Sequence, residues 1–212
     1  MASIAVRQAP DDDREDTGIR KHLWTRDEVY RAMAAGVFDG APTAWLKMEL
    51  IEGELIEKRA QNRPHSIALT KGQRILERIF GEAHYVGVQS PMQVNQASEP
   101  EPDLMVVRGE PDSYPDQPTG RDVVLVVEVS DTTLRQDRVV KPALYARAGV
   151  QEYWVLMLKA RVLEVRREPM RRSELDEWAY QSVELFQSSG VVTPLGASEA
   201  MVLVSDLLPG NA

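Results

Sequence analysis

The sequence predicts an α/β fold, and three observations carry this prediction. The run 122–129 (DVVLVVEV) is rich in β-branched apolar residues and suits a strand that is buried on both faces of a sheet. Residues 65–80 place apolar side chains at helical spacing along one stripe. Residues 48–57 (MELIEGELIE) alternate on either side of a Glu-Gly pair, which is typical of a tight hairpin. With 212 residues and 43% hydrophobic content, the chain can form one domain, which we expect over residues 23–212.

The N-terminal part is expected to begin with a disordered arm. Residues 1–22 contain an acidic run and little that could be buried. Thr25 and Glu28 form a capping-box pattern, and Gly36 is a plausible end for the helix that follows. We therefore expect a short helix over about 26–35.

The remaining elements follow from the same periodicities. Alternation in the first hairpin strand puts Glu49 and Ile51 on one face and Leu50 on the other. A helix is expected within 137–148, with Pro142 either in its first turn or causing a kink. Further strands are expected at 85–94, 104–107, 152–158, 161–167, 179–186 and 201–204.

Composition limits the classes of protein that this chain can represent. It contains no cysteine, which excludes disulfides and thiolate-bound zinc or iron–sulfur clusters. No apolar run approaches the roughly 18 residues that a membrane span requires, and the start has no apolar stretch of the signal-peptide kind. We expect a cytoplasmic protein that does not bind membranes.

The charge is unevenly distributed. A net charge of -8 argues against a protein that holds nucleic acid by electrostatics alone, because phosphate contacts need clustered Lys and Arg. Residues 131–172 nevertheless carry ten Lys and Arg against five Asp and Glu. This stretch predicts either a basic face on an acidic body or a set of solvated strand and loop residues.

Two acidic residues lie in unusually apolar surroundings. Glu128 is near the end of VVLVVEVS, and Asp103 follows a proline and precedes LMVV. A buried carboxylate is costly unless it is paired, hydrogen-bonded or bound to a cation. Two carboxylates at neighbouring strand ends would suit Mg²⁺ or Mn²⁺, which can activate water for phosphodiester hydrolysis. The alternative is that Asp103 caps a turn and Glu128 lies at a solvated strand end.

Five motifs in order resemble a known family. The runs are MELIEGEL followed by PHS, PEPDLMVVRG, VVLVVEVSDTT, DRVVK and YARAGVQEYW. Together they resemble the Uma family of putative restriction endonucleases, within the PD-(D/E)XK nuclease superfamily, over about residues 24–167. The resemblance implies a restriction-endonuclease-like mixed central sheet flanked by helices, to which this chain adds an N-terminal helix and C-terminal strands.

The resemblance also implies a metal site. Asp103 matches the aspartate of the superfamily's Pro-Asp element and is implied as the main ligand of Mg²⁺ or Mn²⁺. Glu128 matches the second acidic position, and Glu49 matches an acidic residue that often helps to bind the metal. The backbone carbonyl of Val129 is implied as a further ligand.

The chain departs from the superfamily pattern at the catalytic lysine. Ser130 stands two residues after Glu128, where a lysine is expected. In the Uma family this role is placed on the following helix, where Lys141 is the matching residue and could orient or deprotonate the attacking water. Pro142 directly after it is expected to disturb the helix. The aspartate that usually follows the family's EYW element is also missing here.

Other residues have two interpretations. His65 could contact a phosphate or a metal-bound water, or make a local hydrogen bond at a helix start. Asp137 could position Lys141, although we favour a helix cap. For the aromatic residues near the C-terminal end of the resemblance, we favour core packing over stacking on bases. They are Tyr145, Tyr153 and Trp154.

The leading hypothesis is a Mg²⁺- or Mn²⁺-dependent endonuclease with DNA as its substrate. The main alternative is a catalytically inactive module that binds nucleic acid or a protein partner. A small enzyme acting on nucleotides or RNA is a third reading, because nothing in the sequence indicates base recognition. By analogy with other nucleases of this fold, a homodimer is also expected.

Overall fold

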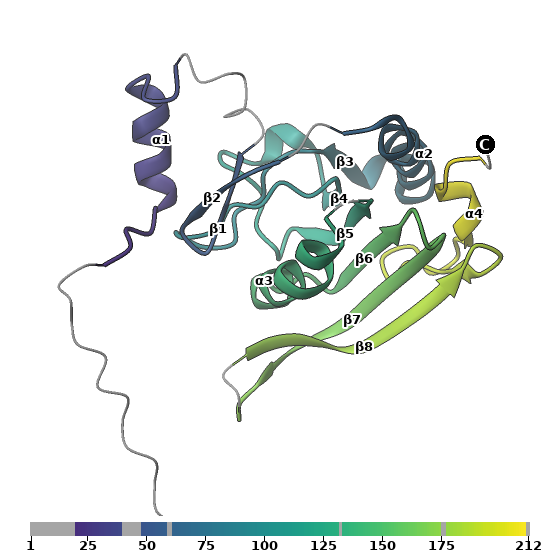
Figure 1. Ribbon diagram of the computed structural model, residues 1–212. Coiled ribbons are helices and arrows are strands. Elements are labelled where there is room, and N and C mark those ends of the chain that lie inside the picture. The colour runs from purple at the N-terminus through teal and green to yellow at the C-terminus, as the bar shows by residue number, and fades with distance from the viewer. Residues whose placement is uncertain (1–19, 40–47, 59–60, 132, 175–176, 211–212) are drawn as a thin grey trace, which may run out of the picture.

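The computed structural model describes residues 20–39, 48–58, 61–131, 133–174 and 177–210. The expected disordered arm lies outside these residues, apart from its last three positions. Figure 1 shows a central sheet with helices on both sides and the first helix set apart from it.

The core of the molecule is a six-stranded mixed sheet with strand order β3-β4-β5-β6-β7-β8. All neighbours are antiparallel except β5 and β6, which are parallel and are connected through α3 (Lys141–Ala148). The strands are β3 (His84–Val88), β4 (Leu104–Arg108), β5 (Val123–Ser130), β6 (Glu152–Met157), β7 (Val162–Arg172) and β8 (Glu177–Gln187). The predicted mixed sheet, with β5 near its centre, is confirmed.

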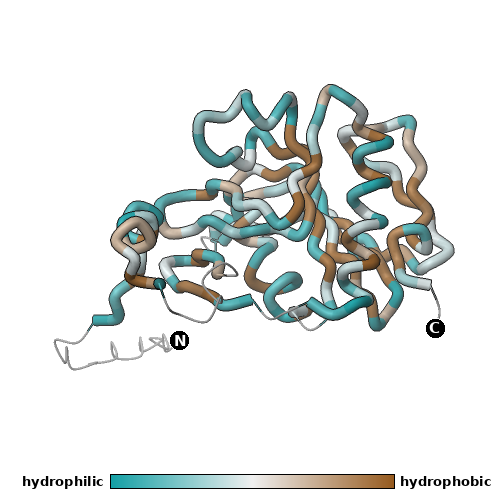
Figure 2. The backbone as a smooth tube through the Cα atoms, turned by 90° about the horizontal axis from the view of Figure 1, so that it is seen from above, coloured by the Kyte–Doolittle hydropathy of each residue, from teal (hydrophilic) through white to brown (hydrophobic). Residues whose placement is uncertain are grey.

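Alternation along β5 separates two hydrophobic cores. Leu125 and Val127 belong to the core under α2 (Arg63–Phe80), whereas Val126 belongs to the core under α3. Because side chains alternate along a strand, Glu128 shares the α3 face with Val126. Every residue of β5 is buried. Figure 2 shows apolar segments gathered among the central strands and polar ones in the outer loops.

The predicted hairpin lies beside the large sheet. It consists of β1 (Met48–Ile51) and β2 (Glu54–Glu57), joined by Glu52 at φ 50° and Gly53 at φ 79°. Leu50 forms an isolated antiparallel bridge with Glu99, which ties β1 to the segment before β4. This bridge brings Glu49 close to the strand that follows Asp103.

The capping box predicts α1 correctly. The helix spans Arg26–Ala34, and Thr25 and Glu28 make both reciprocal hydrogen bonds of the box. Arg26 anchors it to the body through ion pairs with Glu99 and Asp116.

The C-terminal segment covers the α2 face. It contains β9 (Val191–Val192), β10 (Val202–Leu203) and α4 (Val204–Leu207), which pack into the core under α2. The short pairing of β9 with β10 is not predicted from the sequence, which gives a strand only near residues 201–204. In the part of the chain that the structure describes, 3₁₀ turns also lie at Gly81–Ala83 and Pro111–Ser113.

Three strands differ in length from the predictions. β3 ends at Val88, short of the expected residue 94, because Gln89 adopts φ 48° and turns the chain. β7 and β8 pair with each other beyond the expected 161–167 and 179–186. No helix of the described residues is long and apolar enough to span a membrane.

Candidate active site

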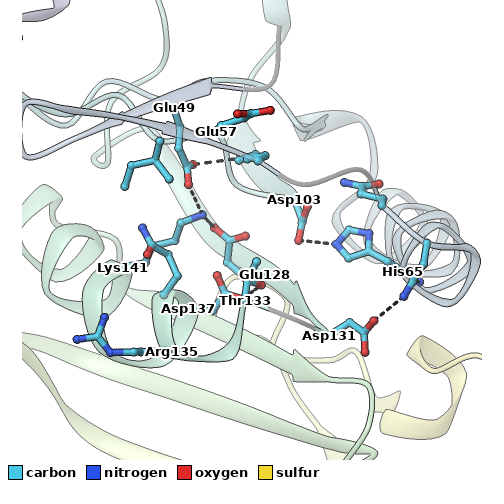
Figure 3. Close-up of a pocket in the computed structure, with 15 residues that line it drawn as sticks. Glu49, Glu57, His65, Asp103, Glu128, Asp131, Thr133, Arg135, Asp137 and Lys141 are labelled. Atoms are coloured by element: carbon cyan, nitrogen blue, oxygen red, sulfur yellow. Dashed lines mark hydrogen bonds and ion pairs between the residues drawn. The ribbon is translucent and has the colours of Figure 1, made fainter. Parts of the chain in front are cut away.

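A cavity of about 500 Å³ brings the predicted site residues together. Its lining includes Glu49 from β1, His65 from α2, Asp103 before β4, Glu128 from β5 and Lys141 from α3. Figure 3 shows these side chains pointing toward one another from five separate segments. All five side chains named as catalytic from the sequence therefore line one cavity.

Lys141 connects two of the buried carboxylates. Its Nζ donates to Oε1 of Glu128 at 2.8 Å and lies 3.2 Å from Oε1 of Glu49. Each of these three side chains is 3–4% exposed. Figure 3 shows the ammonium between the two carboxylates. Glu128 is thus not at a solvated strand end, which was one of the alternatives drawn from the sequence.

Asp103 is held by a different set of donors. Its Oδ2 accepts a hydrogen bond from the Val129 amide at 2.8 Å and lies 3.1 Å from Nε2 of His65. Its Oδ1 accepts from Nε2 of Gln89 at 3.2 Å. The backbone amide of His65 also bonds to Asn62 Oδ1, which caps α2. The local hydrogen bond expected at the helix start is thus present, and contact of His65 with a phosphate or a metal-bound water stays a prediction.

Burial and neighbouring charges shift the pKa values of the ionisable groups in the cavity. Burial, reinforced by the negative charges of Asp103 and Asp137, raises the pKa of Glu128 to about 8 although Lys141 opposes the shift. Burial alone would lower the pKa of Lys141, but Glu128, Glu49 and Asp137 together raise it above its usual value. The lysine is therefore a permanent cation. The carboxyl groups of Glu49, Asp103 and Glu128 outnumber the two ammonium groups near them, which belong to Lys141 and Lys58.

The other two carboxylates are better compensated. Burial opposes ionisation of Asp103, yet His65 and the Val129 amide keep its pKa below the usual value. Burial likewise opposes ionisation of Glu49, and Lys141, Lys58 and the amide of residue 101 lower its pKa. Burial would lower the pKa of His65, but its hydrogen bond to Asp103 and the negative charge there raise it. His65 is thereby biased toward the protonated form.

A π turn delivers Lys141 to the cavity. Residues Gln136–Val140 form this turn, and the amide of Lys141 bonds to the carbonyl of Gln136, five residues back. Pro142, which has no amide proton, lies in the first turn of α3. The expected disturbance by Pro142 is thus a change of helix type immediately before Lys141. Such π turns recur at functional sites.

Asp137 does not cap a helix, which is the role that the sequence favours. Neither the π turn nor α3 has a side-chain cap hydrogen bond. Asp137 is buried, and it accepts a hydrogen bond from Thr133 instead. Helical structure already begins at residue 134, so Asp137 lies within it and not at its start, which local sequence alone does not reveal.

Three further contacts escape the sequence analysis. Tyr145, Tyr153 and Trp154 are fully buried, as expected, but the hydroxyl of Tyr145 also donates to Glu128 at 2.8 Å. Gln89 and Lys58 contact Asp103 and Glu49 from loop positions without a motif. A signal for Tyr145 exists in its spacing, since it lies four residues after Lys141 on the same helix face.

The donors fit a hard divalent cation in kind. Glu49, Asp103 and Glu128 offer carboxylate oxygens, which Mg²⁺ and Mn²⁺ favour. The Lys141 ammonium between Glu49 and Glu128 shows that one positive charge can bridge these two groups. Within the described ranges, however, no three His, Cys, Asp or Glu side chains form a group that could hold a metal ion as they stand. The amide of Val129 contacts Asp103, so the implied ligand residue is also at the site.

Comparisons with known proteins agree with this fold. The model of the Uma2 family, described as "Putative restriction endonuclease", matches residues 37–199. A crystal structure of a putative nuclease belonging to DUF820 from Anabaena variabilis ATCC 29413 is similar in fold, with a TM-score of 0.59 at 18% sequence identity. The likeness covers 76% of this chain and 88% of that one. No curated protein matches this chain.

Proposed function

From the premise that this chain belongs to the Uma2 family of putative restriction endonucleases, we propose that it is a Mg²⁺- or Mn²⁺-dependent endonuclease that hydrolyses phosphodiester bonds in DNA. One observation carries the proposal. Four buried carboxyl groups, of Glu49, Asp103, Glu128 and Asp137, meet in a single cavity with one buried lysine, Lys141.

The proposed metal ligands are Asp103, Glu128 and Glu49, with the carbonyl of Val129 as a fourth. A bound Mg²⁺ or Mn²⁺ would supply a Lewis acid that polarises a phosphate oxygen and activates water. Burial of all three carboxylates supports this role, because charges in such a site act through a low dielectric.

Lys141 is the proposed partner of the attacking water. Its pKa is raised, so it acts as a hydrogen-bond donor and a point charge rather than as a base at neutral pH. In this role it orients the water and offsets negative charge at the phosphorus centre. Because its raised pKa keeps Lys141 protonated at neutral pH, this environment does not favour deprotonation of the water by Lys141.

Two cationic groups are suited to contact the phosphate. His65 lines the cavity with its ring on Asp103 and is biased toward the protonated form. Arg135 also lines the cavity, is exposed, and has no ion pair within the described part of the chain. We propose that these two side chains bind the scissile phosphate, because arginine matches phosphate geometry well.

The deciding experiment is incubation of supercoiled plasmid with the protein and Mg²⁺ or Mn²⁺. Wild type should nick the plasmid, whereas Lys141→Ala and Glu128→Gln should lose most of this activity. Glu152→Gln is the matched control, because Glu152 is a completely buried carboxylate outside the cavity. Its cleavage per folded molecule should equal that of wild type. Cleavage that survives both cavity substitutions would trace the activity to a contaminant or another site.

The alternative is an inactive nuclease fold that binds nucleic acid or a protein partner. The ion pairs of Lys141 with Glu49 and Glu128 favour it, because the ammonium occupies the space between the two carboxylates. A wild-type protein that binds DNA in a gel-shift assay but never cleaves it would support this reading.

Two expectations about organisation stay predictions. The first is a single domain over residues 23–212, which limited proteolysis can check by leaving one resistant core. The second is a homodimer. The outer strand β8 exposes Val183 and Leu185, which makes it the natural candidate for a contact between copies. Light scattering at several concentrations gives the oligomeric state.

A further inference from the structure

We propose that Tyr145 is a positioning residue that orients the Glu128 carboxyl group for cation binding. This inference rests on the proposed function and adds a residue to which no role in the site has been assigned. The sequence places Tyr145 in the core, and burial alone would account for its aromatic ring.

The contact itself is specific. The Tyr145 hydroxyl donates to Oε1 of Glu128 at 2.8 Å, and Nζ of Lys141 donates to the same oxygen at 2.8 Å. Two donors converging on one oxygen fix the rotation of the carboxyl group. Within the described residues, no hydrogen bond reaches the other oxygen, Oε2. The arrangement thus leaves one oxygen of Glu128 for a further cation.

The local backbone explains why the two donors arrive together. Lys141 and Tyr145 are four residues apart on α3 and therefore face the same way. Because the Lys141 amide bonds to Gln136 across the π turn, the Asp137 carbonyl is left for another donor. The hydroxyl of Tyr153 supplies it at 2.6 Å. Tyr153 thus holds the turn that sets the direction of both donors.

Comparison with two neighbouring tyrosines distinguishes a positioning role of Tyr145 from the simpler case of a buried hydroxyl that only needs a hydrogen-bond partner. Tyr145, Tyr153 and Tyr180 are in sequential ring contact, with centroids 5.0 Å and 6.2 Å apart. Tyr153 and Tyr180 donate to backbone carbonyls, of Asp137 and Val150 respectively. Tyr145 alone of these three donates to a side chain that lines the cavity.

The stack also supplies a matched control. Tyr180→Phe removes a buried hydroxyl from the same cluster, but at a position whose bond leads away from the cavity. Any loss caused merely by removing a buried hydroxyl should therefore occur in both variants. A loss of cation affinity should occur only in Tyr145→Phe.

The test is direct titration with Mn²⁺, followed by electron paramagnetic resonance of the free ion, for wild type, Tyr145→Phe and Tyr180→Phe. Groups that hydrogen-bond a metal ligand typically contribute a factor of 10 to 100 in affinity. Because Lys141 still holds Oε1, we expect Tyr145→Phe to raise the Mn²⁺ Kd by roughly tenfold. Tyr180→Phe should keep the wild-type Kd.

The outcomes distinguish this inference from the proposed function. If wild type binds Mn²⁺ and Tyr145→Phe binds it equally well, the positioning role is wrong while the metal site stands. If both phenylalanine variants weaken binding alike, the effect is a general loss of packing and the inference is also overturned. If wild type binds no Mn²⁺ at all, the proposed metal-dependent function and this inference fall together.

Discussion

Two groups of buried carboxylates lie within the described residues, and they are neutralised in different ways. One is the acidic cavity of Glu49, Asp103 and Glu128. The other is the pair Glu152 and Glu164 on β6 and β7, which we call the arginine-bound glutamates. The members of the second group are fully buried, and neither lines the cavity.

The arginine-bound glutamates are saturated. Oε2 of Glu164 accepts a hydrogen bond from Nε of Arg138 at 2.8 Å, and Oε1 accepts one from Nε of Arg166 at 2.6 Å. Nη2 of each arginine lies 2.6 Å from the same oxygen as an ion pair. One oxygen of Glu152 accepts from both Nε and Nη2 of Arg167, and the other accepts from the amide of Leu195 at 2.7 Å. Each carboxylate oxygen of the two glutamates therefore already has a donor.

The acidic cavity is undersupplied by comparison. Glu49 and Glu128 share the ammonium of Lys141, and Glu49 also lies 3.5 Å from the ammonium of Lys58. Asp103 depends on a histidine, an amide and an exposed glutamine. Arginines donate to the carboxylate oxygens of the arginine-bound glutamates. In the acidic cavity a shared lysine neutralises only part of the negative charge, so a further cation could still be attracted. The difference fits a stabilising role for the arginine-bound glutamates and, under the proposed function, a binding role for the acidic cavity.

The largest effect on stability is expected at the arginine-bound glutamates. Arg167→Ala leaves Glu152 buried without its charged partner, which should cost about 3–5 kcal/mol in the free energy of unfolding. Urea denaturation measures it. Arg172→Ala, an exposed arginine at the end of β7, is the matched control and should change stability by less than about 0.5 kcal/mol. Equal losses in the two variants would contradict the distinction.

The pH dependence of the free energy of unfolding should come from the acidic cavity. The pKa of Glu128 is about 8 in the folded protein and near 4.5 in the unfolded chain, so the folded state retains a proton between these values. Stability must then fall as pH rises through this window, by about 1.4 kcal/mol per pH unit or about 2.7 kcal/mol from pH 5 to 7.

Glu128→Gln removes that proton equilibrium. Denaturation in EDTA at pH 5 and pH 7 should therefore show a smaller loss in the variant than in wild type. The difference between the two proteins isolates Glu128 from all other titrating groups. Identical losses would show that the carboxyl group is ionised throughout the range.

A cation should repair the shortage of positive charge. Mn²⁺ at ten times its Kd should stabilise wild type by about 1.4 kcal/mol, which corresponds to a rise in Tm of about 3–6 °C over EDTA. Asp103→Ala should show no such rise, because it lacks the proposed main ligand. Arg167→Ala should melt lower but keep the rise. If Mn²⁺ leaves wild type and Asp103→Ala melting alike, the inactive module becomes the better description.

The sequence predicts those parts of the fold that carry a regular period. β5, α2 and the hairpin around Gly53 each follow from a pattern of residues along the chain. Strand ends do not, because they depend on single backbone angles such as the φ of 48° at Gln89. The extension of β7 and β8 depends on their pairing with each other, which no local pattern encodes.

The acidic residues of the site can be predicted from the sequence, but the groups that neutralise them or donate hydrogen bonds to them cannot. Glu128 is conspicuous in an apolar run, whereas Glu152 and Glu164 give no comparable signal although they are fully buried. Their partners come from three-dimensional neighbours, as when the register places Glu152 opposite Arg167.

The basic stretch 131–172 is also explained by this pairing. The sequence left open whether it forms a basic face or solvated strands, and several of its arginines instead bind buried or nearby glutamates. Arg135, on the cavity rim, has no such partner among the described residues. Part of the positive charge of this stretch is thus neutralised by glutamates of the same molecule.

The smallest effect on stability should accompany a clear effect on binding. Gln89 holds a left-handed conformation, which costs a non-glycine residue about 1–2 kcal/mol, while its amide bonds to Asp103. Gln89→Gly relieves that strain but loses a hydrogen bond worth about 1 kcal/mol and adds backbone freedom to the unfolded chain. The net change in stability should therefore be within about 0.5 kcal/mol.

Affinity should respond differently, because Gln89 orients a proposed metal ligand. Mn²⁺ binding should weaken in Gln89→Gly by about tenfold, as measured by titration. Glu168 has the same backbone strain, with φ 61°, but is exposed on β7 away from the cavity. Glu168→Gly should leave the Kd unchanged. If both glycine variants bind Mn²⁺ like wild type, the strain at Gln89 serves only the turn after β3, and the cavity needs no support from that side.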